Sequence, residues 1–232
     1  MCVVTYFPSN QGFFFTSNRD ENSHRKTMYP QFYQHQKHNL LYPKDLEKGG
    51  TWFAVNKDQK KMACLLNASG LQPHPHKKIS RGHIPLSCLS DDQNFLSHDS
   101  LLKTAPFKLI IIHFYEKTQI EEFHWNGKKL LETRIDETKP KIWFSNTLYN
   151  QKKKQSLTKK FEQDSVIFDK WENIINFHKK IALPNNSPEY LIKNQNIQTV
   201  SITSLNSHKK KAKTLYSSLI EKSKDELYSE LI

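Results

Sequence analysis

A strand, a turn and a second strand occupy the first seventeen residues, and this pattern restricts the fold more than any other feature. Residues Cys2 to Phe7 are rich in β-branched and aromatic side chains, and Phe13 to Ser17 repeat that composition. The intervening segment, Pro8 to Gly12, consists of turn-forming residues. Because the first strand begins at residue 2, we expect no leader, and we expect residue 2 to be held at the end of a sheet strand.

Further strands and helices are predicted along the rest of the chain. After a polar loop that extends to His38, strands are expected at 49–55, 61–67, 107–115, 119–125, 128–135, 141–144 and 199–203. The first four strands of the chain are expected to share one sheet. Helices are expected at 81–89, 155–163, 169–181 and 209–231, and 91–102 is interpreted as helix or loop. This order predicts an α+β fold with layered sheets, and no linker divides residues 1–232 into separate domains.

Lysine accounts for most of the formal net charge of +12, because the chain has only four arginines. The densest lysine runs are Lys152 to Lys154 and Lys209 to Lys211. We interpret both as a solvated face; the alternative is weak binding to anionic lipid or nucleic acid at low salt. Specific recognition of nucleic acid is not expected, because arginine is the usual reader of phosphates and bases.

Cysteine and histidine spacing does not indicate a structural metal site. Cys2, Cys64 and Cys88 show no CxxC spacing, which favours a reducing compartment over a disulfide framework. His74 and His76, with His83, are interpreted as a solvated loop rather than a metal or haem contact. No apolar run approaches the roughly 18 residues of a membrane span, so we expect a soluble, cytoplasmic protein without a transmembrane segment.

Cys2 is the first candidate functional residue. Removal of Met1 is favoured by a small second residue, and it would leave Cys2 with a thiol and a free α-amine. The amine, with a pKa near 7.7–8.0, can accept the thiol proton, so that one residue supplies both nucleophile and base. The alternative is that a small residue follows Met1 by chance.

The second candidate is the cluster Asn18 to Glu21, expected immediately after the second strand. The hairpin returns this cluster to the start of the first strand, beside Cys2. Arg19 can hold a thiolate or a substrate carboxylate, and Asp20 can accept a hydrogen bond from the α-amine. The alternative interpretation is a polar turn with a surface ion pair.

Taken together, the motifs of the chain resemble the NRDE family, also called TANGO2-like (transport and Golgi organisation 2). The resemblance spans almost the whole chain and follows the family's order. It comprises Met1-Cys2, Asn18 to Glu21, Asp45 to Asn56 with its Gly49-Gly50-Thr51-Trp52 core, Asn67, Ser80-Arg81-Gly82 and Ser145-Asn146. The chain departs from the family pattern at Ala68 to Gly70 and at His83.

The resemblance implies a fold and a set of site residues. The NRDE family is in turn similar to the N-terminal-nucleophile (Ntn) hydrolases, which have a four-layer αββα sandwich and act on amide bonds. By that likeness, Cys2 is the nucleophile, Asp20 orients its amine, and Asn67 and Asn146 donate to an oxyanion or substrate. The substrate-binding residues are then Asn18, Arg19, Glu21 and Arg81.

Two functions follow from the resemblance. The first is hydrolysis of an amide or thioester through Cys2. The alternative is a non-catalytic protein that binds or moves haem or acyl lipid, with haem as a transported ligand rather than a cofactor. A third, less specific hypothesis is contact with anionic membranes through the lysine runs, which should weaken as salt rises.

Overall fold

Antiparallel strands make up most of the regular secondary structure in the computed structural model. The structure describes residues 2–69, 79–92, 94–114, 117–184, 196–209, 211–220 and 226–230, with backbone alone at Cys2 and 226–230. The chain divides into two compact units, Met1–His24 with Glu137–Ile232 and Arg25–Asp136. Each unit contains one antiparallel sheet with helices, so the α+β class predicted from the sequence is confirmed.

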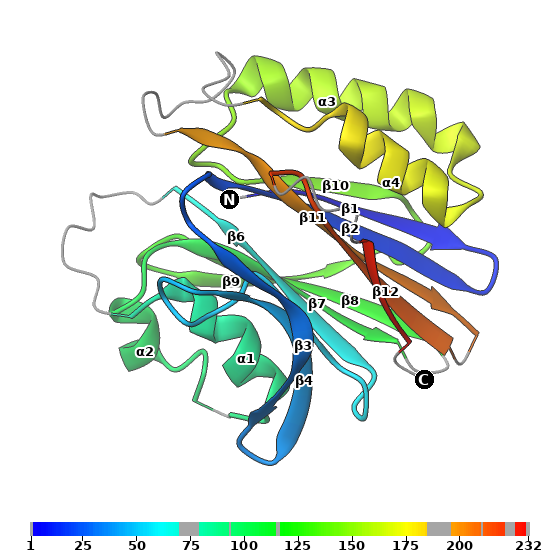
Figure 1. The fold of residues 1–232 in the computed structure, drawn as a ribbon. Coiled ribbons are helices and arrows are strands. Elements are labelled where there is room, and N and C mark those ends of the chain that lie inside the picture. Colours follow the sequence, from blue (N-terminus) through cyan, green and yellow to red (C-terminus); the bar gives the residue numbers. More distant parts are fainter. Residues whose placement is uncertain are drawn as a thin grey trace. The chain divides into compact units, whose positions relative to one another are not determined.

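The first unit contains a six-stranded sheet in the order β10-β1-β2-β11-β12-β13. Its strands are β1 (Cys2–Ser9), β2 (Gly12–Asn22), β10 (Lys141–Phe144), β11 (Ile197–His208), β12 (Lys211–Ser218) and β13 (Glu226–Glu230). Its helices are α3 (Gln151–Asp164) and α4 (Trp171–Lys180), with a 3-10 turn at Ser165–Ile167 between them. Figure 1 shows α3 and α4 lying along one face of this sheet.

The second unit contains a seven-stranded sheet in sequential order from β3 to β9. Its strands are β3 (Thr27–His35), β4 (His38–Asp45), β5 (Phe53–Asn56), β6 (Lys61–Asn67), β7 (Phe107–Phe114), β8 (Thr118–Trp125) and β9 (Leu130–Ile135). A 3-10 turn at Arg81–His83 leads into α1 (Ile84–Leu89), and α2 (His98–Leu102) follows. Helix α1 packs its buried Ile84, Leu86 and Leu89 against the apolar face of this sheet.

The amino-terminal hairpin forms as the sequence predicts, but its second strand is longer. The turn lies at residues 10 and 11, and β2 continues to Asn22. Asn18 to Glu21 therefore lie inside β2 rather than after it, because β11 pairs with β2 along this whole stretch. This pairing supplies the ladder hydrogen bonds that the local sequence does not reveal.

Helix α4 follows the predicted amphipathic pattern. Trp171, Ile174, Ile175 and His178 occupy the buried side of the helix. They face a core that contains Val3 and Phe14 of the sheet and Phe161 of α3, among others. This packing holds α4 over the hairpin and places His178 against β1 and β2.

Three predictions of local structure are wrong. Residues 27–35 form strand β3 rather than part of a polar loop, and strand β4 at 38–45 was not predicted. The first four predicted strands are divided between two sheets. The predicted helix at 209–231 is instead β12 and β13. In β12 the exposed Lys211 and Lys213 alternate with buried Ala212 and Thr214, which is the period of a strand paired on one side with β11.

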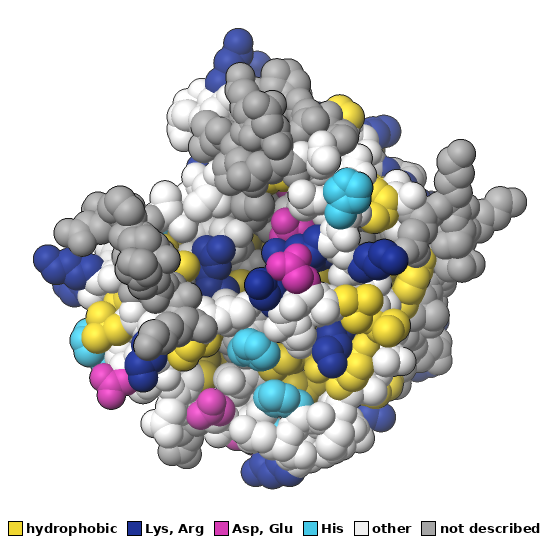
Figure 2. Space-filling view, turned by 60° about the vertical axis from the view of Figure 1, so that its left-hand side comes forward, with side chains coloured by type: hydrophobic (Ala, Val, Ile, Leu, Met, Phe, Trp, Pro, Cys, Tyr) yellow, Lys and Arg dark blue, Asp and Glu magenta, His cyan; other side chains and the backbone are white. Residues whose placement is uncertain are grey.

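Several side-chain predictions are confirmed. All four tryptophans are buried, and Cys64 lies on β6 with no exposed surface. Lys and Arg side chains are spread over the face drawn in Figure 2, with Asp and Glu among them. Within the described residues, no helix has the length and apolarity needed to cross a membrane.

Candidate functional site

The start of β1 lies between two neighbouring strands that carry predicted site residues. Cys2 pairs in register with Arg19 of β2, and Val3 pairs with Asn18. On the other side of β1, Val3 pairs with Phe144, and Asn146 follows the end of β10. The pairings of β1 with β2 and β10 therefore place Arg19, Asp20 and Asn146 at the end of the sheet where β1 begins.

Asp20 is a buried carboxylate at this end of the sheet. Its side chain has no exposed surface, and Thr199 donates a hydrogen bond to Oδ1 at 2.6 Å. The Tyr149 hydroxyl donates to Oδ2. Burial raises the pKa of Asp20 to about 6, and the two hydroxyl donors oppose that shift by favouring the ionised form.

A β-bulge in β11 makes the contact with Thr199. Thr199 pairs with Asp20 and Ser201 pairs with Arg19, so Val200 is the extra residue between two consecutive partners on β2. Thr199 thus reaches Asp20 on the helix-covered face. Because neighbouring residues of a strand point to opposite faces, Arg19 and Ser201 lie on the other face.

Asn18 has a packing role in the structure. Its side-chain Oδ1 accepts from His178 Nδ1 at 2.7 Å, and its Nδ2 donates to the His178 carbonyl at 3.1 Å. The Thr5 hydroxyl lies 2.8 Å from His178 Nε2, where it donates to the neutral ring. Burial lowers the pKa of His178 to about 3, so the imidazole is neutral at physiological pH.

Asn146 and Glu21 make contacts of their own. Lys154 of α3 donates a hydrogen bond to Asn146 Oδ1 at 3.0 Å. The amide nitrogen of Asn146 therefore does not take part in this contact. Glu21 Oε1 accepts from the backbone N–H of Asn22 at 3.0 Å. The Asn146 side chain is half-buried, so this predicted hydrogen-bond donor of the first unit keeps some exposed surface.

Two predicted site residues, Asn67 and Arg81, belong to the second unit. Asn67 ends β6, and Arg81 Nη1 donates to the Pro106 carbonyl at 2.9 Å. Their assignment to a site with Cys2 stays a prediction from the resemblance. His74 and His76 lie outside the described residues.

The glycine motifs of the second unit pack against each other through their backbones. Thr51 N–H donates to the Gly82 carbonyl at 2.8 Å. A side chain at Gly50 would place its Cβ only 2.5 Å from the carbonyl carbon of Gly82. The Gly-Gly-Thr-Trp and Ser-Arg-Gly motifs are therefore joined by a close backbone contact that only glycine permits at residue 50.

A row of hydroxyl groups on the helix-free face of the first unit's sheet was not anticipated from the sequence. Ser17, Ser201 and Thr203 are buried, and their hydroxyls have no hydrogen-bond partner among the described residues. Arg19 lies in the same row and is also buried. The alternation of apolar and hydroxyl residues in 200–203 was the available signal, but its use required the knowledge that β11 pairs with β2.

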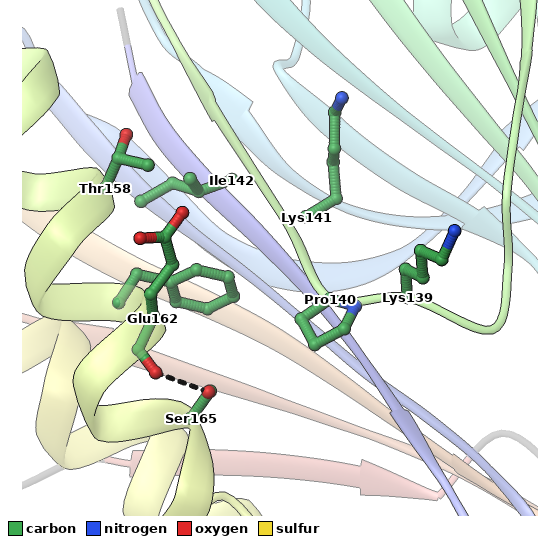
Figure 3. Close-up of a pocket in the computed structure, with 8 residues that line it drawn as sticks. Lys139, Pro140, Lys141, Ile142, Thr158, Glu162 and Ser165 are labelled. Atoms are coloured by element: carbon green, nitrogen blue, oxygen red, sulfur yellow. Dashed lines mark hydrogen bonds between the residues drawn. The ribbon is translucent and has the colours of Figure 1, made fainter.

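A cavity of about 460 Å³ lies between β10 and α3, toward the end of β10 opposite Asn146. Lys139 and Lys141 stand on its β10 side and Glu162 on its α3 side (Figure 3). Ile142 and Phe161 supply apolar lining. The sequence analysis did not predict this cavity, and none of the predicted site residues lines it.

The described residues do not contain three His, Cys, Asp or Glu side chains grouped closely enough to hold a metal ion.

Together, the fold and its contacts define an α+β protein with two large antiparallel sheets and a buried polar cluster at the amino-terminal hairpin. A scan against protein-family models matches Transport and Golgi organisation 2 (TANGO2) over residues 1–229. The chain therefore belongs to the TANGO2 family. A search of curated proteins gives no significant match.

Proposed function

We propose that the protein transfers the acyl group of an amide or thioester to Cys2 and then to water. The observation that carries this proposal is the register of the hairpin, which pairs residue 2 with Arg19 and places Asp20 next to that pair. An N-terminal nucleophile requires a rigid strand end with charged and polar groups around it. The TANGO2 match, which includes residue 2, supports the same assignment.

The reaction begins after removal of Met1. The α-amine of Cys2 takes the thiol proton, and the thiolate attacks the substrate carbonyl carbon to form a C–S bond. The C–N or C–S bond of the substrate then breaks, and the ammonium returns the proton to the leaving group. Water attacks the resulting thioester, which releases the acid and restores the thiol.

Asp20 and Asn146 have separate roles in this proposal. An ionised carboxylate accepts about four hydrogen bonds. Asp20 receives two hydroxyl donors and thus retains capacity for the α-ammonium of Cys2. The Asn146 amide nitrogen supplies a donor to the developing oxyanion. The four-layer αββα arrangement and a contribution from Asn67 are proposed on the resemblance to Ntn hydrolases.

The test is the intact mass of the purified protein before and after incubation with a panel of acyl thioesters and N-acyl amides. We expect loss of Met1 and a single acyl adduct in the wild type, and no adduct in Cys2→Ala. The matched control is Cys88→Ala. Cys88 is buried and its pKa is raised to about 11 by that burial, so its removal should leave the adduct intact.

Two results would contradict the proposal. Retention of Met1 would leave Cys2 without a free amine, and absence of a Cys2-dependent adduct with every probe would remove the nucleophile. Either result would favour the non-catalytic alternative, in which the protein binds haem or an acyl lipid.

A further inference from the structure

Strand β10 is an edge of the first unit's sheet, and it lies beside a cavity. Within the described residues, β10 pairs with β1 alone. The cavity of about 460 Å³ lies between β10 and α3, and both elements belong to the first unit. Figure 3 shows the Ile142 side chain of β10 directed toward α3. A sheet edge next to a cavity can bind an extended peptide, which adds a strand to the sheet and places side chains in the cavity.

The turn of the amino-terminal hairpin determines which backbone groups of β1 face β10. The turn has two residues, so the closing pair, Ser9 and Gly12, exchanges both backbone hydrogen bonds. Hydrogen-bonded and non-bonded pairs then alternate along the hairpin, which directs the backbone groups of Val4 and Tyr6 toward β10. Pro8 has no N–H and falls on a non-bonded pair, as this alternation requires.

The same alternation identifies the backbone groups on the outer edge of β10. Lys141 and Trp143 are the residues that pair with Tyr6 and Val4, so their backbone groups are directed toward β1. The N–H and C=O of Ile142 therefore point away from the sheet, and no hydrogen bond to them is present within the described residues. This unpaired donor and acceptor belong to a residue that lines the cavity.

The lining of the cavity favours an apolar, uncharged side chain. Ile142 is half-buried, and Phe161 of α3 is 3% exposed. The hydroxyls of Thr158 and Ser165 donate to backbone carbonyls of α3, so both already have a partner. Glu162 on the α3 side disfavours a carboxylate inside the cavity. A valine or isoleucine of an added strand fits these conditions.

The neighbouring position of an added strand meets a different environment. The Lys141 side chain is exposed, points away from α3, and has no ion pair or hydrogen bond within the described residues. Helix α3 carries five lysines and two acidic residues, and the whole chain has a net charge of +12. Opposite charges on adjacent strands stabilise their pairing, whereas a lysine discourages other strands from pairing with an edge. An acidic side chain is therefore the complement of Lys141.

We propose that the groove between β10 and α3 binds an extended acidic segment of another protein as an added strand. In this segment, Val or Ile alternates with Glu or Asp, so that apolar side chains enter the cavity and acidic ones lie beside Lys141. A second copy of the chain is a poorer occupant, because it would gather Lys139 and Lys141 of both copies along one edge. The binding site is separate from the chemistry proposed for Cys2.

The first test uses a short fluorescein-labelled peptide in which Glu and Val alternate, with binding to the full chain followed by fluorescence anisotropy. We expect saturable binding. A peptide with the same residues in blocks, and a peptide with Lys in place of Glu, should each bind roughly tenfold more weakly or not at all, because alternation or charge is lost.

The second test asks whether the peptide pairs through its backbone. Only every other N–H of an added strand faces β10. We therefore compare the alternating peptide with N-methyl groups on its Val residues and with N-methyl groups on its Glu residues. One of these two peptides should lose binding and the other should retain it.

Two substitutions test the protein side of the groove. Ile142→Pro removes the outward N–H at a place where an edge strand accepts proline, so it should keep the circular dichroism spectrum and lose the peptide. Ile142→Ala retains the N–H and should keep weakened binding. Lys141→Glu should weaken binding by roughly tenfold, because repulsion replaces attraction. Its matched control is Lys211→Glu, which makes the same change of charge at an exposed position of β12 and should bind as the wild type does.

Several results would overturn the proposal. They are absence of saturable binding, equal binding of the alternating and blocked peptides, the same effect of N-methylation at both sets of positions, and full affinity in Lys141→Glu. The last of these decides the outcome even if Ile142→Pro does not fold. If the peptides do not bind and sedimentation shows a dimer that Ile142→Pro dissociates, the occupant is a second copy and the acidic segment is wrong.

Discussion

At the scale of single residues, His178 joins α4 to the amino-terminal hairpin. Its ring has no exposed surface and bonds to both Thr5 and Asn18. Replacement of His178 by leucine would leave a buried hydroxyl and a buried amide oxygen without partners. We expect His178→Leu to lower the free energy of unfolding by roughly 2–4 kcal/mol, measured by urea denaturation.

The control for this prediction is His208→Leu, because His208 is exposed on β11 of the same unit. That variant should change the free energy of unfolding little. Equal stability of His178→Leu and the wild type would show that the hydrogen bonds of the ring are not needed to hold α4 on the sheet.

Gly50 and Gly49 differ in why they must be glycine. A Cβ on Gly50 meets the backbone of Gly82 at 2.5–2.8 Å, and backbone cannot move aside as a side chain can. Gly49 has open space around it but a φ of +72°, which other residues adopt at a cost of roughly 1–2 kcal/mol. We expect Gly50→Ala to destabilise the protein more than Gly49→Ala in urea denaturation; the reverse order would contradict the close backbone contact.

At the scale of elements, α3 depends on its amino-terminal cap. The Asn150 side chain accepts from the Lys153 backbone N–H at 2.8 Å. Asn150→Ala should lower the unfolding free energy by about 1 kcal/mol, whereas Asn150→Asp should retain the cap and the stability. The urea midpoints of the two variants test this prediction. Equal loss of stability in both variants would mean that the Asn150 cap does not stabilise the helix.

Some elements could be predicted from the sequence because their signals are local. The β8–β9 hairpin turns at Asn126 and Gly127, where the Asn126 side chain accepts from the N–H groups of Lys128 and Lys129. Helix α4 has an apolar stripe of helical period. In contrast, β3 is an edge strand that pairs with β4 alone and has mostly exposed or half-buried side chains, so its composition resembles a loop. Strand β12 begins with the exposed Lys211 and Lys213, and this lysine-rich composition resembles the surface of a helix.

At the scale of the whole molecule, two buried groups of the first unit give stability opposite dependences on pH. His178, with its pKa lowered to about 3, binds a proton more readily when unfolded, so it makes stability rise with pH between about 3 and 6.5. Asp20, with its pKa raised to about 6, binds a proton more readily when folded. It therefore makes stability fall as pH rises from about 4 to 6.

Asp20→Asn removes one of these dependences. We expect the difference in unfolding free energy, variant minus wild type, to rise by about 1.4 kcal/mol per pH unit between pH 4 and 6 and then to level off. Urea denaturation across this range measures the difference, in which the titration of all other groups cancels. A difference that stays flat would mean that Asp20 titrates normally in the folded protein.

The sequence by itself determined the α+β class, the amino-terminal hairpin and the pairing of Cys2 with Arg19 that follows from it, because turn residues and alternation act over short distances. The TANGO2 motifs were recognisable for the same reason: each is a short, contiguous string. Only the tertiary structure decided which strands share a sheet, that Asn18 bonds to His178, and that Thr199 reaches Asp20 through a bulge. Those contacts join residues more than a hundred positions apart. Their partners, and the burial that shifts the pKa values of Asp20 and His178, exist only once β11 and α4 have packed against the hairpin.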